Sequence, residues 1–130
     1  MAAIEIVSPS NKDRAESRGA FVSKVSTLLK QDVCVSIIDV VSTKYLNLYA
    51  DLLTFIDGVD PCLGAMPDPM YAFANRVRDE KHRRLLDSWF YPLEIGQPLL
   101  TLPIWLSENV AVPLDLDACY EATCRMLRIR

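Results

Sequence analysis

The residues best suited to chemistry stand in two apolar segments near the start of the chain. Glu5 interrupts an apolar run at 2–7, and Asp39 lies near the end of a second apolar run at 33–41. A carboxylate in such a run is costly to bury unless it is paired with a cation or bound to a metal ion. Glu5 is therefore a candidate metal ligand. The alternatives are a solvent-facing position on an edge strand and an ion pair with a lysine.

Two lysines are candidates to act beside these carboxylates. Lys12 ends the polar segment Ser8-Pro9-Ser10-Asn11-Lys12, which directly follows the first apolar run. Polar groups at the carboxyl end of a parallel strand lie where α/β folds usually place ligands, although the same segment suits an ordinary turn before a helix. For Lys24 the plainer interpretation is a solvated surface lysine. Asp39 lies near Glu5 if the two runs are neighbouring strands, or else it caps the following helix.

A third group of candidates is basic and is concentrated at 76–84. Its members are Arg76, Arg78, Lys81, His82, Arg83 and Arg84. Such a cluster can contact phosphate, with Arg83 and Arg84 as the positions to test, but interleaved acidic residues favour a solvated turn. The net charge of −3 also argues against nonspecific binding of nucleic acid. One histidine and four scattered cysteines give no support to a nucleophilic triad or a zinc site.

The elements that must position these residues alternate between strand and helix patterns. The runs at 2–7 and 33–41 are rich in β-branched residues, as in buried strands. Between them, a helix begins near Asp13 or near Ser17 and turns one apolar face to the core. A strand, a helix and a strand in this order predict two parallel neighbours with a right-handed crossover. The apolar residues of the helix face are Phe21, Val25, Leu28 and Leu29.

The rest of the chain predicts another buried helix, three strands and a closing helix. The helix at 42–57 is polar along only a narrow stripe, so either the domain encloses it or a partner covers it. A Gly- and Pro-rich loop at 58–69 follows, and a charged turn joins the first two of the later strands. The third is expected at a sheet edge because of Pro103, and the last helix starts near Asp115. The predicted strands occupy 70–77, 85–91 and 99–106.

Length and composition indicate that these elements belong to one folded domain. The chain has 130 residues, of which 51% are hydrophobic and 24% charged, as in one folded domain spanning 1–130. We therefore predict an α/β domain with a mixed sheet and the element order β-α-β-α-β-β-β-α. No apolar run approaches the ~20 residues that cross a bilayer, and the first residues carry no secretion signal. The expected location is cytoplasmic, without membrane association.

The same residues carry a family resemblance that spans nearly the whole chain. The block Ile4-Glu5-Ile6-Val7-Ser8-Pro9-Ser10-Asn11-Lys12, with Lys24 and Ile38-Asp39-Val40-Val41, resembles the bacterial domain of unknown function 4058. The first block is its most specific part. Further matches are Tyr71, Trp89, Pro92-Leu93, Gly96-Gln97-Pro98, Leu102-Pro103, Val112-Pro113-Leu114-Asp115-Leu116 and Tyr120.

That block is also similar to the Uma-type proteins, which have a PD-(D/E)XK nuclease-like fold. In such cores, carboxylates bind Mg²⁺, which activates water and stabilises the transition state of phosphodiester cleavage. The resemblance implies that Glu5 is the acidic residue of the second core strand and that Lys12 or Lys24 orients the water. Asp39 would then be a second Mg²⁺ ligand.

The resembled family also has a segment before this block, including the strand that carries its first aspartate. We therefore expect the chain to be N-terminally truncated relative to that family, as a partial PD-(D/E)XK-like domain. The missing strand would leave the sheet edge at 2–7 unpaired, and such an edge invites pairing with another chain. A second copy of the chain or another protein would then complete the sheet.

Three functional hypotheses follow from these residues. The preferred one is a non-catalytic interaction module whose contact surfaces are the first strand and the apolar helix at 42–57. The second is a Mg²⁺-dependent nuclease with Glu5, Asp39 and a lysine, which lacks one expected ligand. The third is a nucleic-acid-binding module that uses Arg83 and Arg84.

Overall fold

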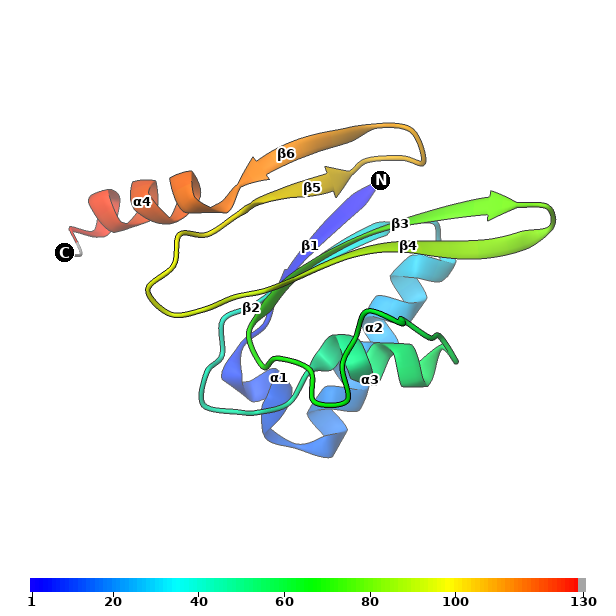
Figure 1. Cartoon of the computed structure of the whole chain (residues 1–130), viewed down its shortest axis with the longest axis horizontal. Coiled ribbons are helices and arrows are strands. Elements are labelled where there is room, and N and C mark those ends of the chain that lie inside the picture. Colours follow the sequence, from blue (N-terminus) through cyan, green and yellow to red (C-terminus); the bar gives the residue numbers. More distant parts are fainter. Residues whose placement is uncertain (129–130) are drawn as a thin grey trace.

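The computed structural model describes residues 1–128, and its centre is a four-stranded sheet in the order β1-β2-β3-β4 (Figure 1). A separate two-stranded ribbon, β5-β6, lies over one face of this sheet, and three helices lie against the other. The elements are β1 (Ala2–Ile6), α1 (Pro9–Asp13), α2 (Ala15–Lys30), β2 (Cys34–Asp39), α3 (Leu48–Phe55), β3 (Tyr71–Glu80), β4 (Arg83–Pro92), β5 (Thr101–Trp105), β6 (Ala111–Asp115) and α4 (Leu116–Leu127).

The first half of the chain forms the predicted β-α-β unit. β1 and β2 are parallel, with Glu5 opposite Ile37, and α2 is the crossover between them. β3 pairs with β2 in the antiparallel direction, so the main sheet is mixed, as predicted. Helix α2 turns Phe21 and Val25 toward this sheet, because apolar residues at helical spacing bury one face together.

Alternation along the strands divides the core into two layers. In β2, Val35 and Ile37 point toward the helices, where Leu48 and other residues of α3 meet them. Ile38 of the same strand points to the opposite face, where Leu102 of β5 packs on the small side chains of β3. The ribbon covers β3 and β2, so one sheet carries a core on both faces.

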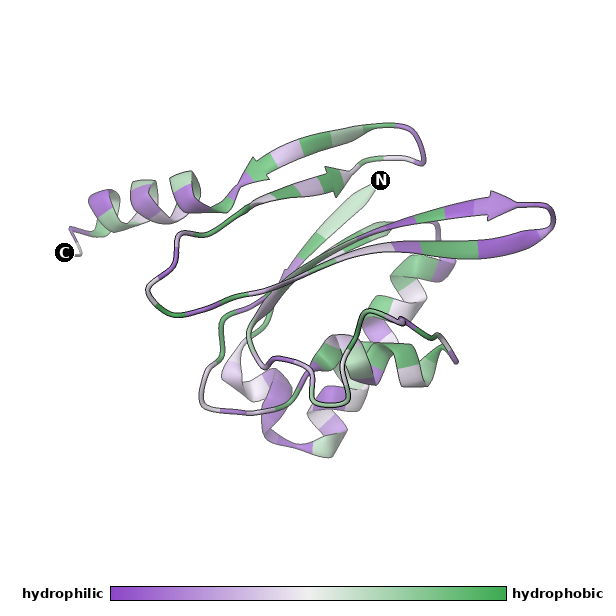
Figure 2. Cartoon of the chain, viewed as in Figure 1, coloured by the Kyte–Doolittle hydropathy of each residue, from purple (hydrophilic) through white to green (hydrophobic). Residues whose placement is uncertain are grey.

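The helix predicted at 42–57 is shorter than expected. α3 starts at Leu48 because the side chain of Asn47 accepts a hydrogen bond from the Ala50 N–H at 2.9 Å and caps the helix there. The segment at 42–47 is a loop, and the carbonyl of Lys44 in this loop contacts the buried Lys12. Helix α3 is coloured mostly as hydrophobic in Figure 2, and the domain itself buries Leu48, Tyr49, Leu52 and Leu53, while Phe55 is 56% exposed. The buried face of this helix is therefore not a free contact surface.

The hairpin β3-β4 is longer than predicted, and its turn is shorter. Lys81 and His82 alone form the turn, with φ values of 48° and 65°. Two consecutive positive φ values are typical of the tight turn that suits the twist of a hairpin. The charged residues that indicated a long turn lie instead on the solvated ends of the two strands, where Asp79 faces Arg84 across the ladder.

The strand predicted at 99–106 exists as β5 and has one neighbour, β6, which the sequence did not reveal. Pro103 and Pro113 face each other in this ribbon. The Leu106 N–H bonds to Val110 O at 2.8 Å, so this facing pair is a hydrogen-bonded pair of the ladder. Hydrogen-bonded and non-hydrogen-bonded pairs alternate along an antiparallel ladder, and Pro103 and Pro113 therefore form a non-hydrogen-bonded pair whose backbone groups point outward. Neither outer edge of the ribbon therefore has a complete set of donors.

The chain continues from the ribbon into α4, which extends beyond the sheet (Figure 1). Asp115 caps this helix through the Ala118 N–H at 2.9 Å, in agreement with the predicted start. Leu116 is its one buried residue. At 8–12 the sequence predicted a turn, whereas the structure has the short helix α1 there. Within residues 1–128, no helix is long and apolar enough to cross a membrane.

Candidate functional site

Glu5 is held by the lysine that follows it on helix α2. The Lys24 ammonium lies 2.9 Å from one carboxylate oxygen of Glu5 and 3.0 Å from the other. The pair borders a shallow hollow of about 350 Å³, whose other polar lining includes Ser10, Asn11 and Ser17. Among the predictions for Glu5, the geometry matches the ion pair with a lysine, at a position that still meets solvent.

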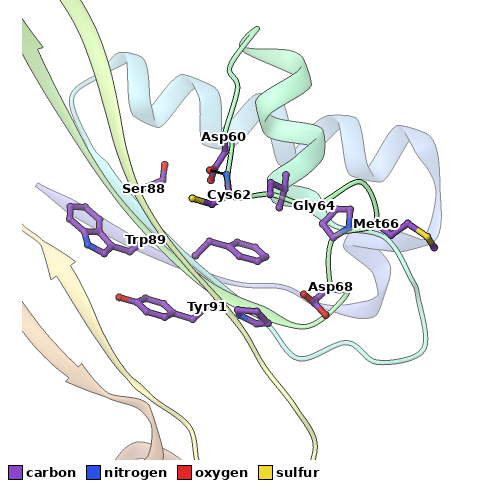
Figure 3. Close-up of a pocket in the computed structure, with 12 residues that line it drawn as sticks. Asp60, Cys62, Gly64, Met66, Asp68, Ser88, Trp89 and Tyr91 are labelled. Carbon is purple, nitrogen blue, oxygen red and sulfur yellow. Dashed lines mark hydrogen bonds between the residues drawn. The ribbon is translucent and has the colours of Figure 1, made fainter.

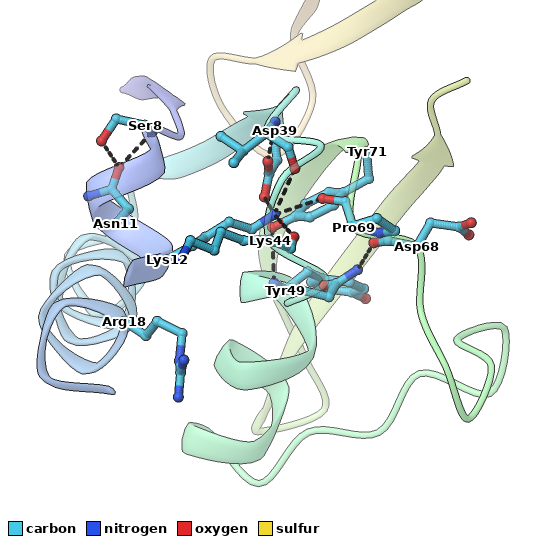
Figure 4. Close-up of polar contacts among 12 residues, drawn as sticks. Ser8, Asn11, Lys12, Arg18, Asp39, Lys44, Tyr49, Asp68, Pro69 and Tyr71 are labelled. Atoms are coloured by element: carbon cyan, nitrogen blue, oxygen red, sulfur yellow. Dashed lines mark hydrogen bonds and ion pairs between the residues drawn. The ribbon is translucent and has the colours of Figure 1, made fainter. Parts of the chain in front are cut away.

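Lys12 is fully buried and forms the centre of a polar network (Figure 4). Its ammonium lies 2.7 Å from an Asp39 carboxylate oxygen and donates to Pro69 O at 2.8 Å. The carbonyls of Lys44 and Val41 are at 3.4 and 3.5 Å. The ammonium therefore holds together the end of β2, the loop at 42–47 and the start of β3.

Asp39 is also fully buried, and its surroundings shift the pKa of its carboxyl in opposite directions. Burial raises the pKa of the Asp39 carboxyl above its usual value, while the Lys12 ammonium and the Val41 N–H, at 3.0 Å, lower it. Burial is the largest influence, so the net direction is upward. The same burial, with Asp39 nearby, raises the pKa of the Tyr71 phenol, whose oxygen accepts from the Tyr49 N–H at 3.1 Å.

Local structure explains how Lys12 reaches this place. The amide oxygen of Asn11 accepts from the Ser8 N–H at 2.8 Å and from the Ser8 hydroxyl at 2.9 Å, which closes the start of α1. Pro9 occupies the first turn, where its missing N–H costs nothing. The resulting single turn of helix projects Lys12 inward, beneath the end of β2. The segment that resembled a ligand-binding loop thus contributes an internal cation.

The structure brings the four predicted residues to one region but separates them into two pairs. Glu5 faces Ile37 in the parallel ladder, and Asp39 lies two residues further along β2, on the same helix-covered face. Each carboxylate is neutralised by its own lysine. In the described part of the chain, no group of three or more His, Cys, Asp or Glu residues is arranged to hold a metal ion. The roles of Glu5 and Asp39 as Mg²⁺ ligands stay predictions.

Three of the six residues in the basic cluster form internal ion pairs. Arg76 and Arg78 both contact Asp87, at 2.7 Å each, and together they lower the pKa of that carboxyl. Arg84 bonds to the Leu29 carbonyl and to an Asp32 oxygen. Arg83 is exposed beside the hairpin turn.

Arg76 also joins the hairpin to the ribbon. Its guanidinium lies 4.5 Å from the ring centre of Trp105 and 5.7 Å from that of Trp89. These contacts give the arginines of β3 a structural role. Of the cluster, Arg83 is the arginine best placed to meet an external phosphate, and the role of Arg83 and Arg84 in nucleic-acid binding stays a prediction.

A second hollow, of about 440 Å³, lies between the loop after α3 and the open side of β4 (Figure 3). The Tyr49 hydroxyl donates to Asp60 at 2.5 Å on its wall, and burial together with this carboxylate raises the pKa of the phenol. Asp60 also accepts from the Cys62 N–H at 2.9 Å, so it orders the Gly- and Pro-rich loop. Sequence reasoning missed this contact, because nothing in the loop's composition indicates which tyrosine it meets.

The outer edge of β1 is an open row of backbone polar groups in the region of the predicted site. The Val7 N–H bonds to Ile38 O at 2.9 Å, and the Cys34 N–H bonds to Met1 O at 3.1 Å. In a parallel ladder, alternate residues of a strand direct their N–H and C=O groups to the same neighbour, so the odd-numbered residues of β1 bond to β2. The N–H and C=O groups of Ala2, Ile4 and Ile6 therefore point outward.

On the ribbon face of this edge strand, the isoleucine side chains are poorly covered. Ile4 is 47% exposed and Ile6 is 69% exposed. Both lie on the ribbon face of the sheet, since Ile6 pairs with Ile38, but the ribbon covers mainly β2 and β3 and leaves these two isoleucines exposed. The predicted unpaired first strand is thus present as an edge of the main sheet.

Comparison with known protein families, with curated proteins and with solved structures finds no match to this chain. The resemblance to the domain of unknown function 4058 and to Uma-type proteins stays a prediction.

Proposed function

We propose that this chain is a non-catalytic interaction module that binds another polypeptide along the outer edge of β1. The observation that carries the proposal is the row of outward backbone groups at Ala2, Ile4 and Ile6, next to exposed isoleucine side chains. An extended segment laid against such an edge gains main-chain hydrogen bonds and apolar contacts together.

The contrast with the other strand edges supports this choice. Pro103 and Pro113 remove donors from the two edges of the ribbon. The open side of β4 ends in charged residues at the hairpin turn and in Pro92 at its other end, and the loop with Asp60 runs beside it. Across residues 1–128, β1 alone has neither a proline nor a covering loop.

The pairing of the predicted catalytic residues supports a non-catalytic role. Lys12 has no solvent access and already has four oxygen atoms within 3.5 Å, so its ammonium has no free direction toward a water molecule. Asp39 is equally buried and does not line the hollow beside Glu5. A Mg²⁺ ion in that hollow would meet one carboxylate, whereas the ion prefers near-octahedral oxygen ligation.

Selection of peptides from a random library tests the proposal. Peptides that bind through β1 should bind the wild-type chain and protect the amides of Ala2, Ile4 and Ile6 from hydrogen exchange. Ile4→Pro removes an outward N–H that the β2 ladder does not use, and it should abolish this binding. Peptides that bind Ile4→Pro equally well, or that protect other amides, would refute strand addition at β1.

A proline control is available in the loop after β4. The Gln97 N–H bonds to Glu94 O at 3.3 Å, and Gly96 has φ of 87°. This arrangement is typical of a type II turn, whose second position favours proline. Ile95→Pro should therefore leave peptide binding unchanged, which separates the loss of an edge donor from a general effect of proline.

The nuclease alternative has its own support in the hollow beside Glu5, with Lys24 on its wall. In that case the chain would be an incomplete PD-(D/E)XK-like core, with an acidic strand followed by a lysine-bearing helix. Calorimetric titration with Mg²⁺ or Mn²⁺ distinguishes the two functions. Binding in the millimolar range that disappears in Glu5→Ala would favour the enzyme. The interaction module predicts no such difference.

A further inference from the structure

We infer that the polypeptide that pairs with β1 is a second copy of this chain, in an antiparallel arrangement centred on Ile4. The inference rests on the proposed function and names its partner. A two-fold axis at Ile4 would join two four-stranded sheets into one continuous sheet. Such an interface is isologous, because each copy offers the same strand to the other.

The register follows from the outward backbone groups. With Ile4 opposite Ile4 of the second copy, Ala2 faces Ile6 and Ile6 faces Ala2. Each facing pair then exchanges two hydrogen bonds, as in the closely spaced pairs of an antiparallel ladder. The next outward donor, the Ser8 N–H, is already bonded to Asn11 Oδ1 at 2.8 Å. The free groups are therefore symmetric about Ile4, and a shifted register would leave some of them unpaired.

Side chains on the ribbon face also suit a second copy. The axis places the two Ile4 side chains side by side and each Ile6 next to the other copy's Ala2. The Met1 amino group donates to Leu106 O at 2.7 Å, so the end of the ribbon lies beside the start of β1. Ile6 of the second copy would approach this end, where Leu106 and Val110 are exposed. Apolar side chains from both copies are thus brought into one patch.

On the helix-covered face, β1 itself brings no unpaired charge to the contact. Glu5 is the one charged residue of β1, and Lys24 neutralises it within the same chain. In the proposed register Glu5 faces Ala3 of the other copy, so the two carboxylates do not oppose each other. The residues of β1 thus raise no repulsion between like charges across the axis.

The mass of the chain in solution tests the inference directly. Sedimentation equilibrium of the wild-type chain should give twice 14.7 kDa at high micromolar concentration. Ile4→Lys places two cations at the axis and should weaken the association by about tenfold or more. Ile95→Lys, at an apolar residue that is even more exposed and lies in the loop after β4, should leave the dimer intact. Far-ultraviolet circular dichroism verifies that each variant is folded.

Disulfide formation tests the register. In a background where Cys62, Cys119 and Cys124 are replaced by serine, Ile4→Cys should cross-link two copies when oxidised glutathione is added. Facing Cα atoms of a closely spaced pair are ~5.5 Å apart, within the range of a disulfide. Ile6→Cys alone should not cross-link, since the two Ile6 positions lie roughly 13 Å apart along the strands.

The outcomes separate this inference from the proposed function. A monomeric wild-type chain, or a dimer that Ile4→Lys leaves unchanged, overturns the second-copy inference. Equal cross-linking through Ile6→Cys also overturns it. If the chain is monomeric but selected peptides still bind at β1, the proposed function stands with a different partner. If neither a dimer nor peptide binding involves β1, both are refuted.

Discussion

Replacing Lys12 by methionine should destabilise the fold strongly, because it removes one half of a fully buried ion pair. The Asp39 carboxylate would lose its cation at 2.7 Å and keep the Val41 N–H as its remaining donor. Pro69 O would lose a donor at 2.8 Å. Breaking a buried pair in this way costs about 3–5 kcal/mol, a large part of the roughly 5–15 kcal/mol that stabilises a domain.

Urea unfolding followed by the fluorescence of Trp89 and Trp105 measures this loss. With a slope of about 2 kcal/mol per molar urea, the midpoint should fall by about 2 M. The matched control is Lys24→Met, which removes the cation of the more exposed pair with Glu5. Exposed pairs contribute about 1 kcal/mol or less, so this variant should unfold close to the wild-type midpoint.

The cost of Lys12→Met should also depend on pH. Burial already raises the pKa of Asp39, and the variant loses the strongest influence that lowers it. An acid whose folded-state pKa is raised binds more protons when folded, so stability falls as pH rises through that pKa. The difference from wild type should therefore be larger at neutral pH than in acid. A cost as small as that of Lys24→Met, or one independent of pH, would refute the assignment of Lys12 and Asp39 as a coupled pair.

Two further predictions concern the loop and the hairpin. Tyr49→Phe removes the hydroxyl that holds Asp60, so the variant should lose about 1–2 kcal/mol in urea unfolding and be cut faster by protease in the loop at 58–69. An unchanged cleavage rate would show that this bond does not order the loop. For the hairpin, fluorescence anisotropy with labelled DNA should show no salt-dependent binding. Salt-sensitive binding that disappears in Arg83→Ala combined with Arg84→Ala would instead favour the nucleic-acid-binding function.

The β-α-β unit at the start of the chain could be predicted because its signals are local. Val35 and Ile37 stand in a continuous apolar run, and the helical spacing of Phe21 and Val25 is regular. The start of α3 could not be placed correctly, since the apolar pattern extends through residues that form a loop. That loop is held by a contact between Lys44 O and a distant lysine, and periodicity carries no information about such a contact.

The candidate site was predictable in its members and not in their pairing. Residue types indicated that a buried Glu5 or Asp39 needs a cation, and Lys12 and Lys24 were the lysines expected beside these carboxylates. The sequence offered these lysines as alternatives for one role, whereas the structure uses both, one inside the core and one near the surface. A single turn of helix makes the difference, because it buries Lys12.

The opposed prolines of the ribbon bear on aggregation. A sheet with two open edges can add subunits at both ends and grow into a fibre. Pro103 and Pro113 each remove an N–H from an outer edge of the ribbon, so neither edge offers a full template for another strand. The other edge of the main sheet, β4, ends in Pro92 and runs beside the loop with Asp60. Pairing through β1 would then consume the remaining open edge of each copy, and assembly would stop at a dimer.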